Sequence, residues 1–316
     1  MSSTSLRCVL LSTTLDLRGY LAQEMAKLDG KVTFVDHLDG SDPADVQMAI
    51  GWHPPADAFD HYPNLKAVCS IAAGADSLLH CPSMRDGIDI VRVVEPAQAE
   101  MMSGFVAWHA ISHQRQMGVY QQQQRDKVWR RQPQRSAADV PVGILGYGAM
   151  GARVASDLAT LGFPVKVWSR TAKPTTSGVL GFSGADGLDR MLDDTEVLVN
   201  LLPLTTETRG ILSASLFAKL RRGAYLIHVG RGPHMVDADV FAALDSGQLS
   251  GAAIDVFPVE PLPTDSPFWT HPKIVLTPHD ACDASMTAIG KTIRATAESV
   301  QAGAKPRDTV DRARGY

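Results

Sequence analysis

The stretch VGILGYGAMGARVASDLATLG, residues 142–162, decides the fold class. Its first four residues, Val142–Leu145, are small or apolar and predict a short buried strand, and a helical pattern runs from Met150 to Leu161. Between these segments lies GYGAMG, whose glycines match a GxGxxG turn. A strand that enters a helix through such a turn is typical of a dinucleotide-binding βαβ unit.

Each glycine of this turn has a separate physical task. Gly146 allows the tight turn, Gly148 lets a pyrophosphate approach the backbone, and Gly151 lets the helix pack closely on the strand. The start of the helix offers free N–H groups and a positive partial charge to the phosphates. We therefore expect a dinucleotide to contact these glycines together with Ala149 and Met150; a plain structural turn is the alternative.

The segment VKVWSRTAK, residues 165–173, indicates which dinucleotide binds. An NAD site usually has an acidic residue at the end of this strand for the ribose 2′-hydroxyl, and this segment has none. Arginine can grip a 2′-phosphate through paired charge-assisted hydrogen bonds. We expect NADP(H) to be preferred, with NAD(H) as the second candidate; an ordinary basic loop is the alternative. The predicted phosphate-binding residues are Ser169, Arg170, Thr171 and Lys173.

The composition is that of a globular protein with room for two domains. The chain has 316 residues, of which 45% are hydrophobic and 20% charged, and its net charge is −4. This charge gives no reason to expect nucleic acid or an anionic membrane as partner, and no apolar run approaches the length of a membrane span or a signal sequence. The four cysteines are widely spaced and form no metal-like cluster with histidine, so we expect buried reduced thiols, no metal and a cytoplasmic location.

Short apolar runs alternate with helix-like segments twice along the chain, in residues 7–94 and again from Pro141. This alternation predicts an α/β protein with two Rossmann-like domains, each a doubly wound parallel sheet, and an active site in the cleft between them. The substrate-binding, flavodoxin-like domain comprises residues 1–98 plus a returning C-terminal segment, 284–316. The NAD(P)-binding domain comprises residues 99–283 and begins with one long helix from Ala99 to Val128.

Charged groups follow several predicted strands of the second domain. Arg231 lies in HVGRG, Asp255 in AIDVF and His279 in LTPHD, and Glu260 follows Asp255 in VEP. Because the carboxyl ends of parallel strands face the ligand crevice, these groups are expected to converge. Taken singly, each residue also has a purely structural explanation. These are a surface ion pair for Arg231, a turn for Asp255, a loop carboxylate for Glu260, and a capping or core position for His279.

Several stretches together resemble the D-isomer-specific 2-hydroxyacid dehydrogenases. They are GILGYGAMG, NLLPLTTETRGIL, HVGRG and DVFPVEPLPTDSPFWTHPKIVLTPH in the second half, and IAAGAD in the first. Within that family the chain is most similar to glyoxylate/hydroxypyruvate reductases of the A type. The segments that favour this subfamily are GWHPP at residues 51–55, VWSR, and the helix end at YQQQQRDKVW.

The resemblance implies catalytic roles that suit the chemistry of each residue. Arg231 would bind the substrate carboxylate and carbonyl oxygen through its planar fork. His279 would be the acid/base group, protonating the carbonyl oxygen during reduction, and Glu260 would pair with it and favour the imidazolium. Asp280 departs from the family pattern, which often has a small or apolar residue after the catalytic histidine.

The same resemblance implies further contacts. Asp255 would hydrogen-bond the nicotinamide carboxamide, and the backbone N–H groups of Gly74 and Ala75 would bind the carboxylate. Trp52 would either form a wall of the substrate pocket or fill the core of the first domain. The remaining residues implied to lie along the cofactor are Leu202, Pro203, Thr208, Val229 and Gly230, and the remaining substrate contact is Ala73.

Three questions stay open from the sequence. The substrate is a small 2-oxo acid such as glyoxylate or hydroxypyruvate, or a bulkier one such as phenylpyruvate or a branched 2-ketoacid. A dinucleotide-sensing binding protein is a third, non-catalytic hypothesis, disfavoured because Arg231, Glu260 and His279 are all present. His228 and His234 are rival acid/base candidates, although strand alternation makes His228 structural. The family resemblance also implies a homodimer that contacts through the long helix.

Overall fold

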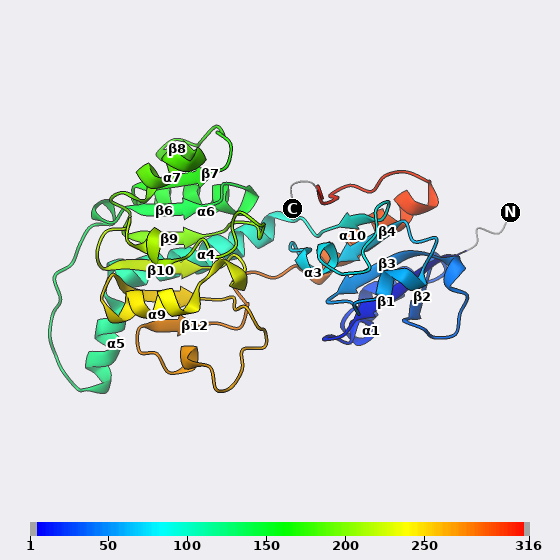
Figure 1. Cartoon of the computed structure of the whole chain (residues 1–316), viewed down its shortest axis with the longest axis horizontal. Coiled ribbons are helices and arrows are strands. Elements are labelled where there is room, and N and C mark those ends of the chain that lie inside the picture. Colours follow the sequence, from blue (N-terminus) through cyan, green and yellow to red (C-terminus); the bar gives the residue numbers. More distant parts are fainter. Residues whose placement is uncertain (1–4, 313–316) are drawn as a thin grey trace. The chain divides into compact units, whose positions relative to one another are not determined.

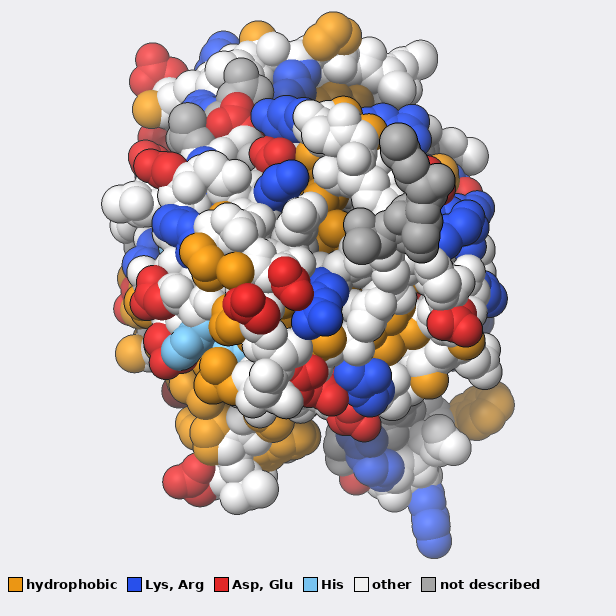
Figure 2. Space-filling model, turned by 90° about the vertical axis from the view of Figure 1, so that its right-hand side faces the viewer, with side chains coloured by type: hydrophobic (Ala, Val, Ile, Leu, Met, Phe, Trp, Pro, Cys, Tyr) orange, Lys and Arg blue, Asp and Glu red, His pale blue; other side chains and the backbone are white. Residues whose placement is uncertain are grey.

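The computed structural model describes residues 5–312, and these form two compact units (Figure 1). Of these residues, 5–97 and 283–312 form unit 1, and Gln98–Cys282 form unit 2. Within the described residues, no helix is long and apolar enough to cross a bilayer. Acidic and basic side chains are interspersed on the face shown in Figure 2.

Unit 1 is built on a five-stranded, all-parallel sheet of strand order β2-β1-β3-β4-β5. The strands are β1 Leu6–Ser12, β2 Val32–Asp36, β3 Val46–Trp52, β4 Ala67–Ser70 and β5 Asp89–Val91. The helices are α1 Leu17–Tyr20, α2 Ala22–Ala26, α3 Asp76–Leu79 and α10 Met286–Gln301, with 3-10 turns η1 Pro43–Asp45 and η2 Ala58–His61. Apolar cores cover both faces of this sheet, as a parallel sheet requires.

The C-terminal helix α10 belongs to the core of unit 1. Its apolar side chains, among them Ile289 and Ile293, pack in one cluster with residues of β1, β3 and β4. The helix begins at Ser285, whose hydroxyl accepts the Ala288 N–H at 3.1 Å. The Glu95 carboxylate in turn accepts the N–H and the hydroxyl of Ser285 at 2.6 and 2.9 Å. The last helix of the chain therefore completes the unit formed by the first strands.

Unit 2 contains a seven-stranded parallel sheet of order β12-β11-β10-β9-β6-β7-β8. The order reverses at β6, which pairs with both β7 and β9, and ligands of doubly wound folds bind at such a switch point. These two parallel sheets confirm the predicted α/β fold class. The strands are β6 Val142–Leu145, β7 Val165–Ser169, β8 Val179–Ser183, β9 Val197–Asn200, β10 Ala224–His228, β11 Leu249–Ile254 and β12 Ile274–Leu276.

Two predicted features of unit 2 are corrected by the structure. The single helix expected from Ala99 to Val128 is two helices, α4 Pro96–Gln114 and α5 Met117–Arg125. The break lies at Gln116, whose φ of 57° is left-handed and whose side-chain amide donates to the Pro133 carbonyl at 2.8 Å. Strand β8 was not predicted because it is a largely exposed edge strand with a glycine in its middle. The other helical segments are α6 Ala149–Thr160, α7 Gly184–Leu192, α8 Ala214–Phe217, α9 Asp237–Asp245, η3 Ala137–Asp139, η4 Gly232–His234 and η5 Pro267–Trp269.

The four cysteines, all among the described residues, form no disulfide, as expected from the sequence. Cys8, Cys69 and Cys81 are buried, and burial raises the pKa of Cys69 to about 12, which keeps this thiol protonated. Cys282 differs from the expectation because it is only partly buried.

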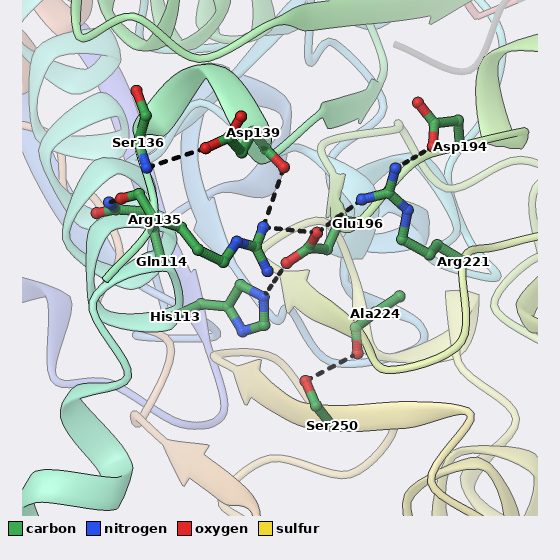
Figure 3. Close-up of polar contacts among 10 residues, drawn as sticks. All are labelled: His113, Gln114, Arg135, Ser136, Asp139, Asp194, Glu196, Arg221, Ala224 and Ser250. Carbon is green, nitrogen blue, oxygen red and sulfur yellow. Dashed lines mark hydrogen bonds and ion pairs between the residues drawn. The ribbon is translucent and has the colours of Figure 1, made fainter. Parts of the chain in front are cut away.

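At the amino end of the unit 2 sheet, one buried carboxylate joins three segments of the chain (Figure 3). Glu196 directly precedes β9, and its side chain is 6% exposed. It forms hydrogen bonds with His113 of α4 at 2.9 Å, Arg135 at 2.8 Å and Arg221 at 3.1 Å. Burial acts to raise the pKa of Glu196, but the bonds from His113 and Arg135 outweigh it and lower the pKa to about 2. The carboxylate therefore ties α4 and the segment before β6 to the sheet.

We predict that Glu196→Gln destabilises unit 2 in a pH-dependent way. A carboxyl pKa lowered from 4.5 to about 2 corresponds to about 3 kcal/mol of stability. Because the folded-state pKa is the lower one, this contribution is complete above pH 4.5 and is lost as the pH falls toward 2. Urea unfolding followed by circular dichroism should show a large loss for the variant at pH 7 and a much smaller difference from the wild type at pH 3.

The matched control is Asp194→Asn, which removes the other partner of Arg221. Asp194 is 58% exposed, and exposed ion pairs contribute at most about 1 kcal/mol. Equal destabilisation by the two variants would contradict the role of Glu196 as the buried anchor.

Candidate active site

The glycine turn between β6 and α6 fits a bound pyrophosphate. Gly146 has a φ of +102°, and a Cβ there would lie 2.8 Å from the Leu201 carbonyl oxygen. A Cβ on Gly151 would lie 2.0 Å from the carbonyl oxygen of Gly146, so the helix could not pack against the turn. At Gly148, which caps α6, a Cβ would meet nothing within 4 Å. The turn is therefore tightly packed at Gly146 and Gly151, whereas space remains at Gly148. This space lies beside the free N–H groups of Ala149 and Met150 at the start of α6.

The end of β7 places basic side chains beside this turn. Lys173 donates to the carbonyl of Tyr147, inside the GxGxxG motif, at 2.9 Å. Ser169 is nearly buried, and its hydroxyl donates to the Thr171 carbonyl at 2.9 Å, which orders the start of the loop. Arg170 lies between them in sequence and is exposed. A small pocket here is lined by residues that include Tyr147, Ser169 and Lys173. The residues present suit a phosphate group at this position.

Arg231 lies on a tightly packed turn after β10. A Cβ on Gly232 would lie 1.9 Å from the Phe257 carbonyl carbon, and a Cβ on Gly230 would lie 2.9 Å from atoms of Asn200 and His234. Neither glycine adopts a positive φ, so close packing and not an unusual backbone conformation requires them. The Arg231 guanidinium donates to the Gly230 carbonyl at 2.7 Å.

Two buried histidines support this turn. The Asn200 amide nitrogen lies 3.2 Å from Nδ1 of His228 and 3.1 Å from Nδ1 of His234, and the Arg231 N–H donates to the same His234 nitrogen at 3.0 Å. Since Nδ1 accepts, each ring is neutral and carries its proton on Nε2, which in His234 faces the Pro203 carbonyl at 3.1 Å. Burial lowers the pKa of His228 to about 3. Both rings have no exposed surface, so they position the turn instead of serving as acid/base groups.

His279 and Glu260 form a hydrogen-bonded pair at the carboxyl end of the sheet. His279 Nδ1 lies 2.7 Å from one Glu260 carboxylate oxygen, and the other oxygen accepts the Phe257 N–H at 2.8 Å. Burial acts to raise the pKa of Glu260, but these two bonds and the charges of His279 and Arg231 outweigh it, so the net shift is downward. Glu260 is thus an anion that receives Nδ1–H and leaves Nε2 of the 40% exposed His279 ring for a ligand.

Asp255 holds the loop that carries His279. This side chain is 1% exposed, and one carboxylate oxygen accepts the Thr277 hydroxyl at 2.6 Å and the Asp280 N–H at 2.8 Å. The other oxygen accepts the Ala281 N–H at 3.1 Å, and the Asp255 carbonyl accepts the N–H of His279 at 2.8 Å. His279 itself has a φ of +59°, an uncommon conformation for a residue with a side chain. Asp255 therefore determines the conformation of this loop, a role that sequence reasoning missed.

The remaining predicted cofactor residues lie on neighbouring loops. Thr208 bonds within its own loop, donating to the Pro203 carbonyl at 2.8 Å and accepting the Thr205 N–H at 2.8 Å. Leu202 and Val229 are buried at the ends of β9 and β10. These residues order the loops that follow the two strands.

The predicted substrate residues Trp52 and Ala73–Ala75 belong to unit 1. Ala73–Ala75 form the turn between β4 and α3, where the Ser70 hydroxyl donates to the Gly74 carbonyl at 2.7 Å and accepts the Ala72 N–H at 3.1 Å. Trp52 ends β3 and is packed against the apolar core of unit 1. Trp52 is only partly buried, so its packing on the core leaves part of the residue exposed.

The glycine turn, the switch point at β6 and the histidine–glutamate pair define a nucleotide-dependent oxidoreductase of the α/β class. Residues 107–281 match the family model for the D-isomer specific 2-hydroxyacid dehydrogenase NAD binding domain. The chain belongs to this family of oxidoreductases, as its sequence motifs predicted.

Individual relatives are similar over nearly the whole chain. Glyoxylate/hydroxypyruvate reductase A of Yersinia enterocolitica is 37% identical over 279 residues, which cover 87% of this chain and 88% of the relative. The crystal structure of the NADPH-dependent glyoxylate/hydroxypyruvate reductase of Sinorhizobium meliloti, in complex with NADP and sulfate, is 34% identical with a TM-score of 0.90. A D-isomer specific 2-hydroxyacid dehydrogenase of Xanthobacter autotrophicus Py2, in complex with NADPH and MES, is 35% identical with a TM-score of 0.90. Each structural match covers 99% of this chain and 100% of the other.

Proposed function

We propose that the chain reduces a small 2-oxo acid, glyoxylate or hydroxypyruvate, to the corresponding 2-hydroxy acid with NADPH. The observation that carries the proposal is the 2.7 Å pair of His279 and Glu260, which lies at the same sheet edge as the Arg231 turn and the glycine turn. NADPH supplies the hydride in this reaction. The names of the similar Yersinia and Sinorhizobium reductases favour these two substrates.

The chain's own residues bind the substrate and move the proton. The Arg231 guanidinium is planar and permanently charged, so it suits a two-point grip on the carboxylate and the carbonyl oxygen. His279 donates a proton from Nε2 to the carbonyl oxygen in reduction and takes the alcohol proton in the reverse direction. Glu260 holds Nδ1 and compensates the positive charge of the ring. The turn at Ala73–Ala75 and Trp52 are proposed as the substrate contacts of unit 1.

The cofactor assignment follows from the open glycine turn and the basic end of β7. Gly148 leaves room for the pyrophosphate, and Ser169, Arg170, Thr171 and Lys173 are proposed to bind the 2′-phosphate. The NADPH and NADP complexes of the similar structures support this choice over NADH. The loops that bear Leu202, Pro203, Thr208, Val229 and Gly230 are proposed to contact the nicotinamide half, whereas the buried Asp255 carboxylate is proposed to act through the loop that carries His279.

We predict that purified protein oxidises NADPH when glyoxylate or hydroxypyruvate is added. Arg231→Lys should lower kcat/KM by about 100-fold or more, because the loss of one preorganised hydrogen-bond donor reduces the rate by about this factor. Absorbance at the reduced-nicotinamide band measures both rates. Arg222→Lys, at an exposed arginine near the other end of β10, is the matched control and should retain full activity. Turnover only with phenylpyruvate or a branched 2-ketoacid would replace the substrate assignment, and no turnover of any 2-oxo acid would favour the binding-protein hypothesis.

We predict that Arg170→Ala selectively weakens the use of NADPH. Loss of a charge-assisted phosphate contact costs about 1.5–3 kcal/mol, or roughly 10- to 100-fold in kcat/KM for NADPH. The kinetics with NADH are the internal control and should change little, because NADH lacks the 2′-phosphate. A parallel loss with both cofactors would contradict the assignment of Arg170.

We also propose that the chain forms a homodimer through α4, α5 and the segment that follows them. Apolar side chains are exposed along this surface, and Trp129 is 100% exposed, an arrangement typical of a covered interface. A second copy of the chain is the proposed occupant. The exposed residues of this surface are Met101, Trp108, Ile111, Met117, Val119, Val128 and Trp129.

The cytoplasmic location stays a prediction from composition.

We predict that the double variant Trp108→Glu, Trp129→Glu is monomeric. A charge in a buried interface is costly to desolvate, whereas on an exposed surface it is well tolerated. Light scattering during size-exclusion chromatography measures the mass of wild type and variant. The control is Trp269→Glu, at a half-exposed tryptophan outside this surface, which should leave the dimer intact. A monomeric wild type would overturn the proposal.

A further inference from the structure

A cluster of metal-ligating side chains lies in unit 1, outside the nucleotide-binding unit. His37 directly follows β2, and Asp57 and His61 begin and end the short turn η2. Each offers one nitrogen or oxygen ligand atom, and these atoms lie within 4.8 Å of one another. The rings of His37 and His61 meet edge to face with centroids 5.4 Å apart, and His61 Nε2 lies 3.3 Å from an Asp57 carboxylate oxygen.

We propose that His37, Asp57 and His61 bind one divalent transition-metal ion of the zinc type. Two imidazoles and a carboxylate match the ligands that zinc takes in proteins, and the remaining tetrahedral position is left to water. Hard ions such as Mg²⁺ and Ca²⁺ prefer oxygen ligands alone. A tetrahedral zinc ion holds its ligand atoms about 3.3 Å apart. The His61–Asp57 pair already has this spacing at 3.3 Å, so any shortening falls on the distances to His37, and the 68% exposed Asp57 side chain has room to rotate toward it.

The backbone around the cluster is held in place by buried contacts. Arg85 donates to the carbonyls of Phe59 and Tyr62, and the Ser83 hydroxyl accepts the Phe59 N–H at 3.1 Å. Phe59 and Tyr62 are themselves buried in the core of unit 1. The turn η2 is therefore a fixed support for the two ligands that flank it, and preorganised ligands bind a metal more tightly than mobile ones.

A neighbouring hydroxyl orients the third ligand. His37 Nδ1 lies 2.9 Å from the Tyr62 hydroxyl, whose oxygen also accepts the Leu38 N–H at 3.3 Å. When Nδ1–H donates to this oxygen, Nε2 is the nitrogen that binds the metal, the arrangement that histidine ligands commonly adopt. Asp57 makes no side-chain cap bond to η2, so its carboxylate is not committed to the helix end. A bound ion would join the end of β2 to η2 and stabilise this side of unit 1.

The test is zinc binding by the intact chain, measured by equilibrium dialysis and by the shift in the unfolding temperature of unit 1. We expect binding of one zinc ion per chain and a higher unfolding temperature with zinc present, because the ion binds only the folded site. His37→Gln and His61→Gln should weaken binding by at least about 10-fold, since each removes one of three ligands. Asp57→Asn, at an exposed position, should weaken it without unfolding the protein, which keeps the test valid if a histidine variant misfolds.

The matched control is His271→Gln in unit 2. His271 lies 3.7 Å from Asp245, so it is a histidine–carboxylate pair without a second histidine, and its loss should leave zinc binding unchanged. Unchanged binding in Asp57→Asn and in both cluster histidine variants, or no zinc bound by the wild type, would overturn the proposal. Because neither readout uses enzyme turnover, the result is independent of the proposed reductase activity.

Discussion

The hydrogen bonds that the buried Asp255 carboxylate accepts from the loop after β12 are the constraint on which the site depends. They fix Thr277, Asp280 and Ala281, and so they hold His279 in a left-handed conformation that the loop would not adopt alone. With His279 held there, its Nδ1 meets Glu260, and the side chain stays 40% exposed. A buried anion with three donors is stable because its desolvation is offset by those bonds. The geometry of the histidine–glutamate pair therefore depends on the loop that follows β12 and not on the two side chains alone.

The two edges of the unit 2 sheet have different roles: the amino edge holds a buried network that stabilises the fold, and the carboxyl edge holds positioned groups that can bind ligands. At the amino end, Glu196 is saturated by two arginines and a histidine, and this network joins segments that are distant in sequence. At the carboxyl end, Asn200, His234 and Asp255 position the Arg231 turn and the His279 loop, and the His279 side chain stays 40% exposed. A buried network that is fully satisfied rigidifies a fold, and exposed, positioned groups can bind ligands. The parallel arrangement of strands separates these tasks because all strands begin at one edge and end at the other.

Sequence reasoning predicted the features that depend on local pattern. The GxGxxG turn, the strand pattern and the charged residues at strand ends are visible in short windows, so the fold class and family were predicted correctly. The helix break at Gln116 was missed because a single left-handed glutamine carries no strong signal, and its amide bonds to a residue 17 positions away. The close packing that requires glycine at position 232 was also missed, because the Phe257 backbone lies against Gly232 only in the folded sheet. Strand alternation indicated that His228 is structural, but the role of Asn200, at the end of an otherwise apolar strand, in joining His228 to His234 was missed.

The cluster of His37, Asp57 and His61 also depends on contacts between segments that are distant in the sequence. His37 lies 20 residues before Asp57 in the sequence, and only the folded positions of β2 and η2 bring the ligand atoms of His37, Asp57 and His61 within 4.8 Å of one another. The expectation of no metal rested on the four cysteines, which form no metal-like cluster with histidine, and it did not consider a site without cysteine. The pairs His61–Asp57 and His279–Glu260 both join a histidine to a carboxylate, but the first is longer, at 3.3 Å against 2.7 Å, and their surroundings differ. Glu260 accepts a backbone N–H and pairs with one histidine, an arrangement that suits proton transfer. Asp57 is exposed and lies beside two imidazoles, an arrangement that suits metal coordination.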